Sequence, residues 1–280
     1  MRGALGGALR AAWRTPTGRG GALILLAITL LAVLGPVVVQ DPAAMPDVMA
    51  GPQPPSAAHW LGTDPLSRDI LSRVVHGARI SLGIAAVAVA LSILLGTTIG
   101  AASGYLGGWV DGITMRVVDA GLAIPRLFVL LLLVLVWERI PTLTLAIVIG
   151  TTGWLGTSRL VRGEVLRLRR LDFVRAAEAL GASGWRIVFR HLIPNTIGPV
   201  AVSATLGVAD VILLEAGLSF LGLGVQPPTP SWGGMILEAR PVLLSAPWTS
   251  LAPGLAILIT VLAVNLVGDA LRGAFDPRSA

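Results

Sequence analysis

The sequence contains no cysteine and no lysine, and charged residues make up only 13% of it. Without cysteine the chain can form neither disulfides nor thiolate zinc sites, and it has no cysteine nucleophile. Without lysine it cannot hold a Walker A loop, because the lysine of that loop reaches the nucleotide phosphates. Any ATP chemistry must therefore belong to another chain.

The shortage of charge also decides the class of protein. An ordinary globular chain carries about 25% charged residues to cover its surface, whereas this chain is 54% hydrophobic and has a mean hydropathy of +0.81. Much of its surface must face lipid, where the backbone has to satisfy its own hydrogen bonds. The composition predicts an all-α integral membrane protein.

Six apolar stretches are long enough to cross a bilayer as helices. The predicted spans are residues 21–39, 80–106, 117–137, 143–160, 197–218 and 251–271. Pro125 interrupts the third. The first is longer than the apolar region of a signal peptide and ends without a small-residue cleavage site, so we expect it to be retained.

The arginines predict the orientation of these spans. With both termini in the cytoplasm, the cytoplasmic segments hold 15 arginines and the outer segments five, which agrees with the positive-inside rule. Residues 1–20 and 273–280 are then cytoplasmic, residues 40–79 lie outside, and residues 80–272 form the core. The net charge of +6 is explained by this topology and by attraction to anionic lipid rather than by nucleic-acid binding.

Two further sequence patterns predict local packing, one outside the spans and one within the second span. From Asp64 as N-cap to Gly77 after its end, a short helix would place Arg68 and Arg73 on one face, lying on the outer membrane surface or against a partner. Within the second span, glycines at 96, 100 and 104 recur every four residues, which permits close helix packing.

The cytoplasmic segment 161–196 is too long and too polar for a simple turn. Asp172 can cap a helix over 173–180 that Gly181 would end, and Ser183 can cap a second helix over 184–193 that breaks at Pro194. Phe173, Ala177 and Leu180 would form an apolar ridge on the first helix. The residues alone leave two interpretations equally open: docking of a partner protein, and contact with anionic lipid.

Several motifs resemble one family of membrane proteins. The sequence RAAEALGAS over 175–183, followed by RHLIPN over 190–195, resembles the EAA loop of ABC importer permeases, whose pattern Ala176, Ala177, Gly181 and Pro194 match. HWLGTDPLSRD over 59–69, GARISL over 77–82 and LSFLGLGVQPPTPSWG over 218–233 resemble the C-type membrane subunit of dipeptide, oligopeptide and nickel importers.

The resemblance implies a type I ABC importer permease in the bacterial cytoplasmic membrane. Its partners would be a B-type sister permease, two ATPase subunits that hold ATP and magnesium, and an extracytoplasmic solute-binding protein. The solute would be a dipeptide or oligopeptide, with glutathione or a nickel chelate as alternatives. The residues implied in coupling to the ATPases are Phe173, Arg175, Ala176, Ala177, Glu178, Leu180, Gly181 and Pro194.

Arg175 departs from the family pattern, which usually has glutamate there. A glutamate would close a capping box with Asp172 and favour the positive end of the helix, whereas Arg175 opposes the helix dipole. A pair with Glu178 at i, i+3 would return about 0.3 kcal/mol. We expect docking to be retained with its first contact altered.

Three charged residues within the spans are candidates for the substrate path. A carboxylate at the position of Asp210 costs about 2.5–3.5 kcal/mol in a bilayer, so it should face a cavity or a partner, either as a path wall or as a capped structural acid. Glu215 is either a path residue or interfacial, and Arg126 is a bulky cation on the path. Asp119 is about 10 Å of helical rise from Arg126, too far for a direct pair.

The sequence contains no constellation typical of an enzyme or a metal site. His59, His76 and His191 are far apart in sequence, and no HExxH or GxSxG motif occurs. We expect no cofactor or metal in this chain. The function predicted is half of the membrane channel of an ATP-driven importer. The competing interpretation is a self-sufficient, ion-gradient-driven transporter, which would need coupled midplane acids and usually an internal repeat.

Overall fold

The computed structural model describes residues 13, 15–39, 41–44 and 50–275 of the chain. Most of the predicted basic N-terminal segment, with Arg2, Arg10 and Arg14, and residues 276–280 of the tail lie outside this part. The elements are α2 (Pro16–Val38), α3 (Ile70–Leu106), α4 (Gly108–Ala123), α5 (Arg126–Val134), α6 (Thr142–Leu168), α7 (Asp172–Ala179), α8 (Gly184–Ile187), a π-helix (Val188–Leu192), α9 (Ile193–Asn195), α10 (Ile197–Phe220), α11 (Trp232–Ala239), a 3₁₀ turn (Arg240–Val242) and α12 (Trp248–Phe275). The predicted all-α fold is confirmed.

Four helices are long and apolar enough to cross a membrane, namely α2, α3, α10 and α12. They coincide with the predicted spans 21–39, 80–106, 197–218 and 251–271. The pair α4 and α5 makes a fifth candidate if it counts as one span. Helix α6 contains the predicted span 143–160 but is less apolar, because its buried face includes Gly150, Thr157 and Ser158 and its inner half carries arginines.

The third predicted span is not one continuous helix. Helix α4 ends at Ala123 and α5 starts at Arg126, with an angle of 86° between them. Pro125 causes the break, because the residue before a proline is pushed out of the helical region, and Ile124 is extended with φ −96° and ψ 128°. The interruption predicted at Pro125 is thus confirmed, and the two helices together remain a candidate for the third span.

The prediction of a short outer helix starting at Asp64 is wrong. The Asp64 carboxylate accepts hydrogen bonds from the backbone N–H of Leu66 and Arg68 and so closes a turn, and the helix begins only at Ile70. The cap is Asp69, which accepts from the N–H of Ser72 at 2.8 Å. From there α3 runs 37 residues without a break at Gly77. Most of the amphipathic segment is therefore the N-terminal part of a long apolar helix.

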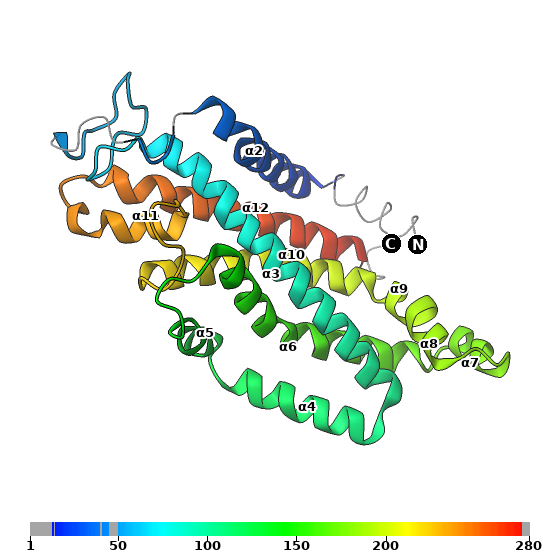
Figure 1. Ribbon diagram of the computed structural model, residues 1–280. Coiled ribbons are helices and arrows are strands. Elements are labelled where there is room, and N and C mark those ends of the chain that lie inside the picture. Colours follow the sequence, from blue (N-terminus) through cyan, green and yellow to red (C-terminus); the bar gives the residue numbers. More distant parts are fainter. Residues whose placement is uncertain (1–12, 14, 40, 45–49, 276–280) are drawn as a thin grey trace.

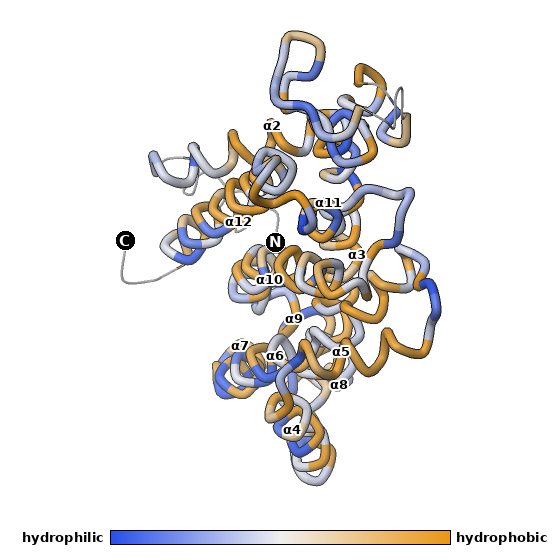
Figure 2. Tube along the Cα trace, turned by 90° about the vertical axis from the view of Figure 1, so that its left-hand side faces the viewer, coloured by the Kyte–Doolittle hydropathy of each residue, from blue (hydrophilic) through white to orange (hydrophobic). Residues whose placement is uncertain are grey.

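The helices form layers in which α3 and α6 make the most extensive contact. Figures 1 and 2 show α2 at one edge of the bundle and α4 at the other, with α3, α6, α10 and α12 between them. The predicted glycine packing is confirmed: a Cβ on Gly96 would lie 2.9 Å from the carbonyl oxygen of Trp154, and one on Gly100 would lie 2.9 Å from Cα of Ser158. Small residues thus let the two helices approach at backbone distance.

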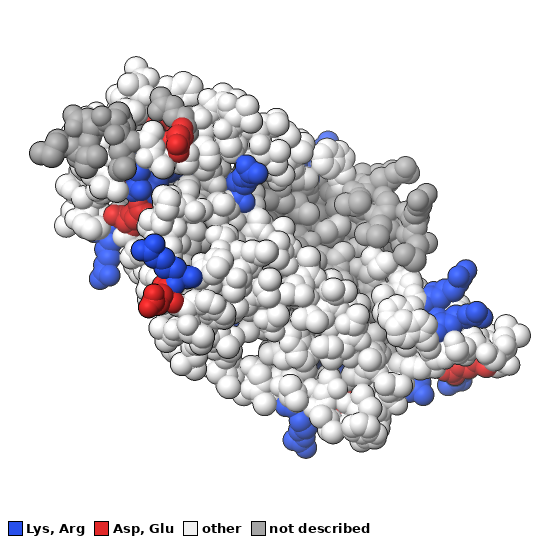
Figure 3. Space-filling model, viewed as in Figure 1, with Lys and Arg blue, Asp and Glu red and all other residues white. Residues whose placement is uncertain are grey.

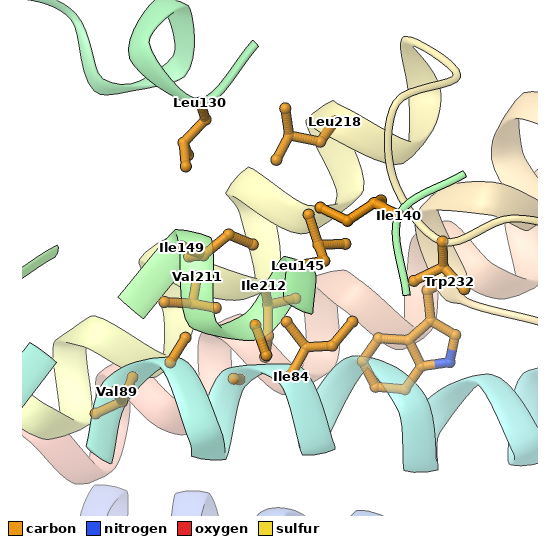
Figure 4. Packing of buried hydrophobic residues seen from close by; sticks show 14 of the residues in the cluster. Ile84, Val89, Leu130, Ile140, Leu145, Ile149, Val211, Ile212, Leu218 and Trp232 are labelled. Carbon is orange, nitrogen blue, oxygen red and sulfur yellow. The ribbon is translucent and has the colours of Figure 1, made fainter. Parts of the chain in front are cut away.

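The main core lies between α3, α6, α10 and α11, where Ile84, Leu145, Ile212 and Trp232 are fully buried (Figure 4). On the face shown in Figure 3 charged side chains gather mainly towards the two ends of the molecule, and the surface between them is mostly uncharged. The exposed apolar surface of α2 belongs to this uncharged zone. Such a distribution suits a molecule whose middle faces lipid.

Candidate functional site

An open cavity of about 260 Å³ lies between α3, α5, α6 and α10. Its walls combine apolar side chains, hydroxyl groups, glycines and one residue of each charge. The lining residues are Val89, Ser92, Ile93, Arg126, Gly153, Gly156, Thr157, Ser203, Leu206, Gly207, Asp210 and Val211. Two of the three predicted path residues, Arg126 and Asp210, therefore line one cavity.

Arg126 and Asp210 form an ion pair, with 2.6 Å between the arginine Nη1 and the aspartate Oδ2. Arg126 also donates from Nε to the hydroxyl of Thr152 at 3.2 Å and from Nη2 to the carbonyl of Ile149 at 2.7 Å. Its side chain is 25% exposed, whereas that of Asp210 is 59% exposed. The arginine is thus held against α6, and the aspartate stands open to the cavity.

The local fold determines where Arg126 lies. The break at Pro125 makes Arg126 the first residue of α5, so its side chain leaves the bend towards α6. On α6, Gly153 leaves room for the guanidinium, because a Cβ there would lie 2.8 Å from Arg126 Nη2. The sequence prediction that Asp119 does not pair with Arg126 is confirmed, since Asp119 pairs with Arg159 instead.

Glu215 lies apart from the residues that line the cavity. It is fully buried near the C-terminal end of α10, where it accepts hydrogen bonds from Ser219 at 2.7 Å and from Ser81 at 3.2 Å. Ser81 in turn accepts from the backbone N–H of Trp232 at 3.3 Å. Glu215 therefore ties α3, α10 and α11 together here, and its predicted role on the path stays a prediction.

The segment Asp172–Asn195 forms a helical elbow made of α7, α8, the π-helix and α9. Val174 of α7 is fully buried beside Ile187 and Leu192, and this cluster packs on Val161 and Val165 of α6. Figure 1 shows α7 and α8 at the end of the molecule opposite α11. The elbow is therefore attached to the ends of α3 and α6 by buried apolar contacts.

Gly181 makes the turn of the elbow, as predicted. Its φ of +78° lies in the left-handed region, which glycine adopts without a steric penalty. The N–H of Gly181 donates to the carbonyl of Glu178, and that of Ala182 donates to the carbonyl of Ala177. These two bonds are the Schellman motif that ends a helix.

The second half of the elbow differs from its prediction. The helical path does not break at Pro194 but continues through the π-helix and α9 as far as Asn195. Proline is tolerated in the first turn of a helix because it needs no N–H partner there, and Pro194 lies in the first turn of α9. Asp172 lies in the first turn of α7 rather than at its cap, which is Leu171.

The residues predicted to couple to an ATPase are largely accessible. Leu180 is 89% exposed, and Phe173, Arg175, Ala176, Glu178 and Gly181 are also exposed, whereas Ala177 and Pro194 are half-buried. The ridge of Phe173, Ala177 and Leu180 therefore faces outwards. The sequence reasoning missed Trp185, 74% exposed, whose ring lies 3.9 Å from that of Phe189; their i, i+4 spacing was the available signal.

Comparison with known proteins identifies the family. Residues 92–280 match the family described as binding-protein-dependent transport system inner membrane component. The chain belongs to this family. It is similar to the dipeptide transport system permease protein of Alkalihalophilus pseudofirmus, with 40% identity covering 92% of this chain and 84% of the relative.

Two further relatives are named for other solutes. The oligopeptide transport system permease protein of Bacillus subtilis is 40% identical over 92% of this chain and 84% of its own length. The glutathione transport system permease protein of Pectobacterium atrosepticum is 42% identical over 80% of this chain and 74% of its own length. The chain is thus an inner-membrane permease of the binding-protein-dependent ABC type, and not itself a catalyst. This membership decides against the ion-gradient alternative.

A cluster of charges lies at the end of the molecule that is predicted to be outside, and the sequence analysis placed only its two arginines, Arg68 and Arg73, on a polar face. Asp64, Arg68, Arg73 and Glu238, here called the outer charge cluster, join the loop before α3, α3 itself and α11. Arg73 is only 2% exposed, and its Nη1 and Nη2 donate to Glu238 at 2.8 and 3.1 Å. Glu238 lies 165 residues from Arg73, so spacing gave no signal for the pair.

Arg175 of this permease forms no ion pair with Glu178 within the described part of the chain. The expected i, i+3 partner is thus not engaged, and both side chains are exposed. An arginine is therefore presented at the first turn of the exposed helix, available to an acidic group of another chain.

Proposed function

We propose that this permease forms one half of the translocation path of an ATP-driven importer of small peptides. The observation that carries the proposal is the elbow: an exposed apolar and charged knob packed onto the inner ends of α3 and α6. A force applied to α7 there would be transmitted to the two helices that bound the cavity. The names of the relatives indicate that the class of solute is peptides.

The proposed topology has six crossings with both ends of the chain inside. Helices α2, α3, α10 and α12 are four of them, the bent pair α4 and α5 is one, and α6 is the sixth because it packs along α3. Helix α2 runs between the same two ends, since Gly21 faces Ala263 of α12 and Gly35 faces Val75 of α3. The elbow then lies in the cytoplasm and the outer charge cluster outside.

The proposed partners follow from the surfaces. Two ATPase subunits, which hold ATP and magnesium, would dock on this elbow and on that of a sister permease. Phe173, Arg175, Ala176, Ala177, Glu178, Leu180, Gly181 and Pro194 would form the docking segment, and Arg126 and Asp210 would line the path. The sister permease would close the open side of the cavity, and a solute-binding protein would deliver the peptide from outside.

Reconstitution of the transporter in liposomes tests this function. The complex of this permease, its sister permease and their ATPases, supplied with the binding protein outside and ATP inside, should accumulate radiolabelled dialanine. Omitting ATP or the ATPases should reduce uptake to the rate of empty liposomes, because the permease supplies the path and not the energy. Uptake at full rate by this chain alone would contradict the proposal.

A further inference from the structure

The charges that line the cavity form a single, balanced dipole. Among the described lining residues, Arg126 and Asp210 are the only charged ones, and they have opposite signs. A solute with one net charge would leave either the cation or the anion of this site uncompensated. A solute that carries one group of each sign would compensate both.

Both members of the pair keep unused bonding capacity. An arginine has five N–H donors, and Arg126 uses three of them, on Thr152, Ile149 and Asp210. Two of these bonds go to α6, so the guanidinium stays in place when Asp210 moves. Within the described part of the chain, Oδ1 of Asp210 accepts no hydrogen bond, and 59% of this side chain is exposed.

This exposure argues against a purely structural ion pair. A charge retained inside a membrane protein for stability is expected to be buried and fully bonded, because its desolvation has to be offset. Arg126 meets that description in part and Asp210 does not. Asp210 instead keeps one carboxylate oxygen without a hydrogen bond from the described residues, at a cavity that Ser92, Thr157 and Ser203 also line.

We propose that the Arg126–Asp210 pair is a binding site for a zwitterionic solute, whose carboxylate contacts the guanidinium of Arg126 and whose ammonium contacts the carboxylate of Asp210. The inference rests on the proposed function and names what the path recognises: the two free termini of a short peptide. A guanidinium binds a carboxylate well, because its geometry allows two parallel hydrogen bonds.

The dimensions of the cavity suit a short peptide. An extended dipeptide has its ends about 7 Å apart, so its termini reach the outer sides of the two charges. The volume of about 260 Å³ is slightly below the roughly 300 Å³ at which small-molecule pockets begin. This volume suits a small solute. It also suits a cavity whose remaining wall is supplied by the sister permease. The hydroxyls can bond the peptide amide, and Val89 and Leu206 can contact its side chains.

The absence of cysteine allows a direct test. Ser203→Cys places the chain's single thiol on the cavity wall, and its labelling by a neutral methanethiosulfonate reagent is read as a mass shift of this chain alone. The assembled complex, without ATP, is labelled in the presence of dialanine, N-acetyl-dialanine or dialanine amide. The first has both termini charged, the second lacks the ammonium and the third lacks the carboxylate.

Dialanine should slow the labelling at the lowest concentration. Each blocked peptide should need roughly tenfold more or higher, because it loses one charge-assisted hydrogen bond. Added to Ser203→Cys, Arg126→Gln should make dialanine and dialanine amide equivalent while N-acetyl-dialanine stays weaker. Asp210→Asn should do the reverse, making dialanine and N-acetyl-dialanine equivalent.

Two results would overturn the site. If the three peptides protect the thiol equally, the cavity does not read termini; this comparison needs only Ser203→Cys and so does not depend on the charge variants assembling. If both variants weaken all three peptides alike, the pair is structural. Failure of the proposed function is distinct: the complete unmodified system would then take up no dialanine with ATP, whereas failure of the site alone leaves that uptake intact.

Discussion

In the outer charge cluster, replacing a single residue should affect charged partners that lie far from it in the sequence. Asp64 accepts hydrogen bonds from two backbone N–H groups and from the guanidinium groups of Arg68 and Arg73. With Glu238 the cluster holds two cations and two anions, and only Glu238 is appreciably exposed. Neutralising Asp64 leaves two cations sharing the single anion Glu238, at a place where Arg73 has almost no contact with water.

We therefore expect Asp64→Asn to lower the free energy of unfolding by about 3–5 kcal/mol, the usual cost of breaking a buried charge pair from one side. Unfolding of the purified permease by SDS in mixed micelles, followed by far-UV circular dichroism, measures the change. The matched control is Asp269→Asn, because Asp269 faces Arg272 at 4.0 Å with both side chains well exposed. It should change the free energy by less than about 1 kcal/mol. Equal effects of the two substitutions would mean that the outer charge cluster is hydrated.

Asp210 shows how much of the candidate site could be predicted from the sequence. A carboxylate inside a span has to face something polar, and this rule alone placed Asp210 on a cavity or a partner. It could not name Arg126 as that partner, since the two are 84 positions apart in sequence. Only the break at Pro125 and the space left by Gly153 bring the guanidinium to Asp210.

At the scale of helices, the turn at Gly181 sets the shape of the elbow. Its left-handed φ is compatible with glycine and tolerable for asparagine, but a β-branched residue is strained there by about 1–2 kcal/mol. No side chain or backbone atom lies within 4 Å of a Cβ built at this position. A substitution at Gly181 thus acts through the backbone and not through a steric clash.

Gly181→Val should therefore reshape the elbow and weaken the binding of the ATPase subunits roughly 5–30-fold, the factor that such a strain energy represents. Titration of detergent-solubilised permease complex with the ATPase, followed by co-purification, measures that affinity. Gly181→Asn serves as the control, because it also adds a side chain but tolerates the left-handed region, and it should bind close to the unmodified level. A loss of binding with Asn as great as that with Val would refute the backbone explanation.

Element boundaries were predictable where local chemistry dictates them and not where tertiary contacts do. Gly181 ends α7 because of its own backbone freedom, and the sequence shows that. Gly77 looked like a helix end for the same reason, yet it lies within α3, where its lack of a side chain admits Trp232 at close range. A glycine needed for packing cannot be told from a glycine needed for a turn until the neighbouring helix is known.

The two ends of the molecule carry different segments, and this difference suggests an experiment on membrane topology. One end carries the outer charge cluster, α11 and the loop after it, and the other carries the elbow (Figure 1). The inner segments hold three times as many arginines as the outer ones. By the positive-inside rule we expect the elbow to lie in the cytoplasm, where the proposed coupling to an ATPase also requires it.

Two single-cysteine variants can test that orientation, since the chain has no thiol of its own. Ser245, after α11, and Ser183, in the elbow, are both exposed. In intact spheroplasts a membrane-impermeant maleimide should label Ser245→Cys and leave Ser183→Cys unlabelled, because the bilayer separates the reagent from the elbow. After permeabilisation both should react, which shows that the thiol at 183 is accessible. Labelling of Ser183→Cys before permeabilisation would contradict the proposed topology. It would place the elbow on the outer side of the membrane, where no ATPase could bind it.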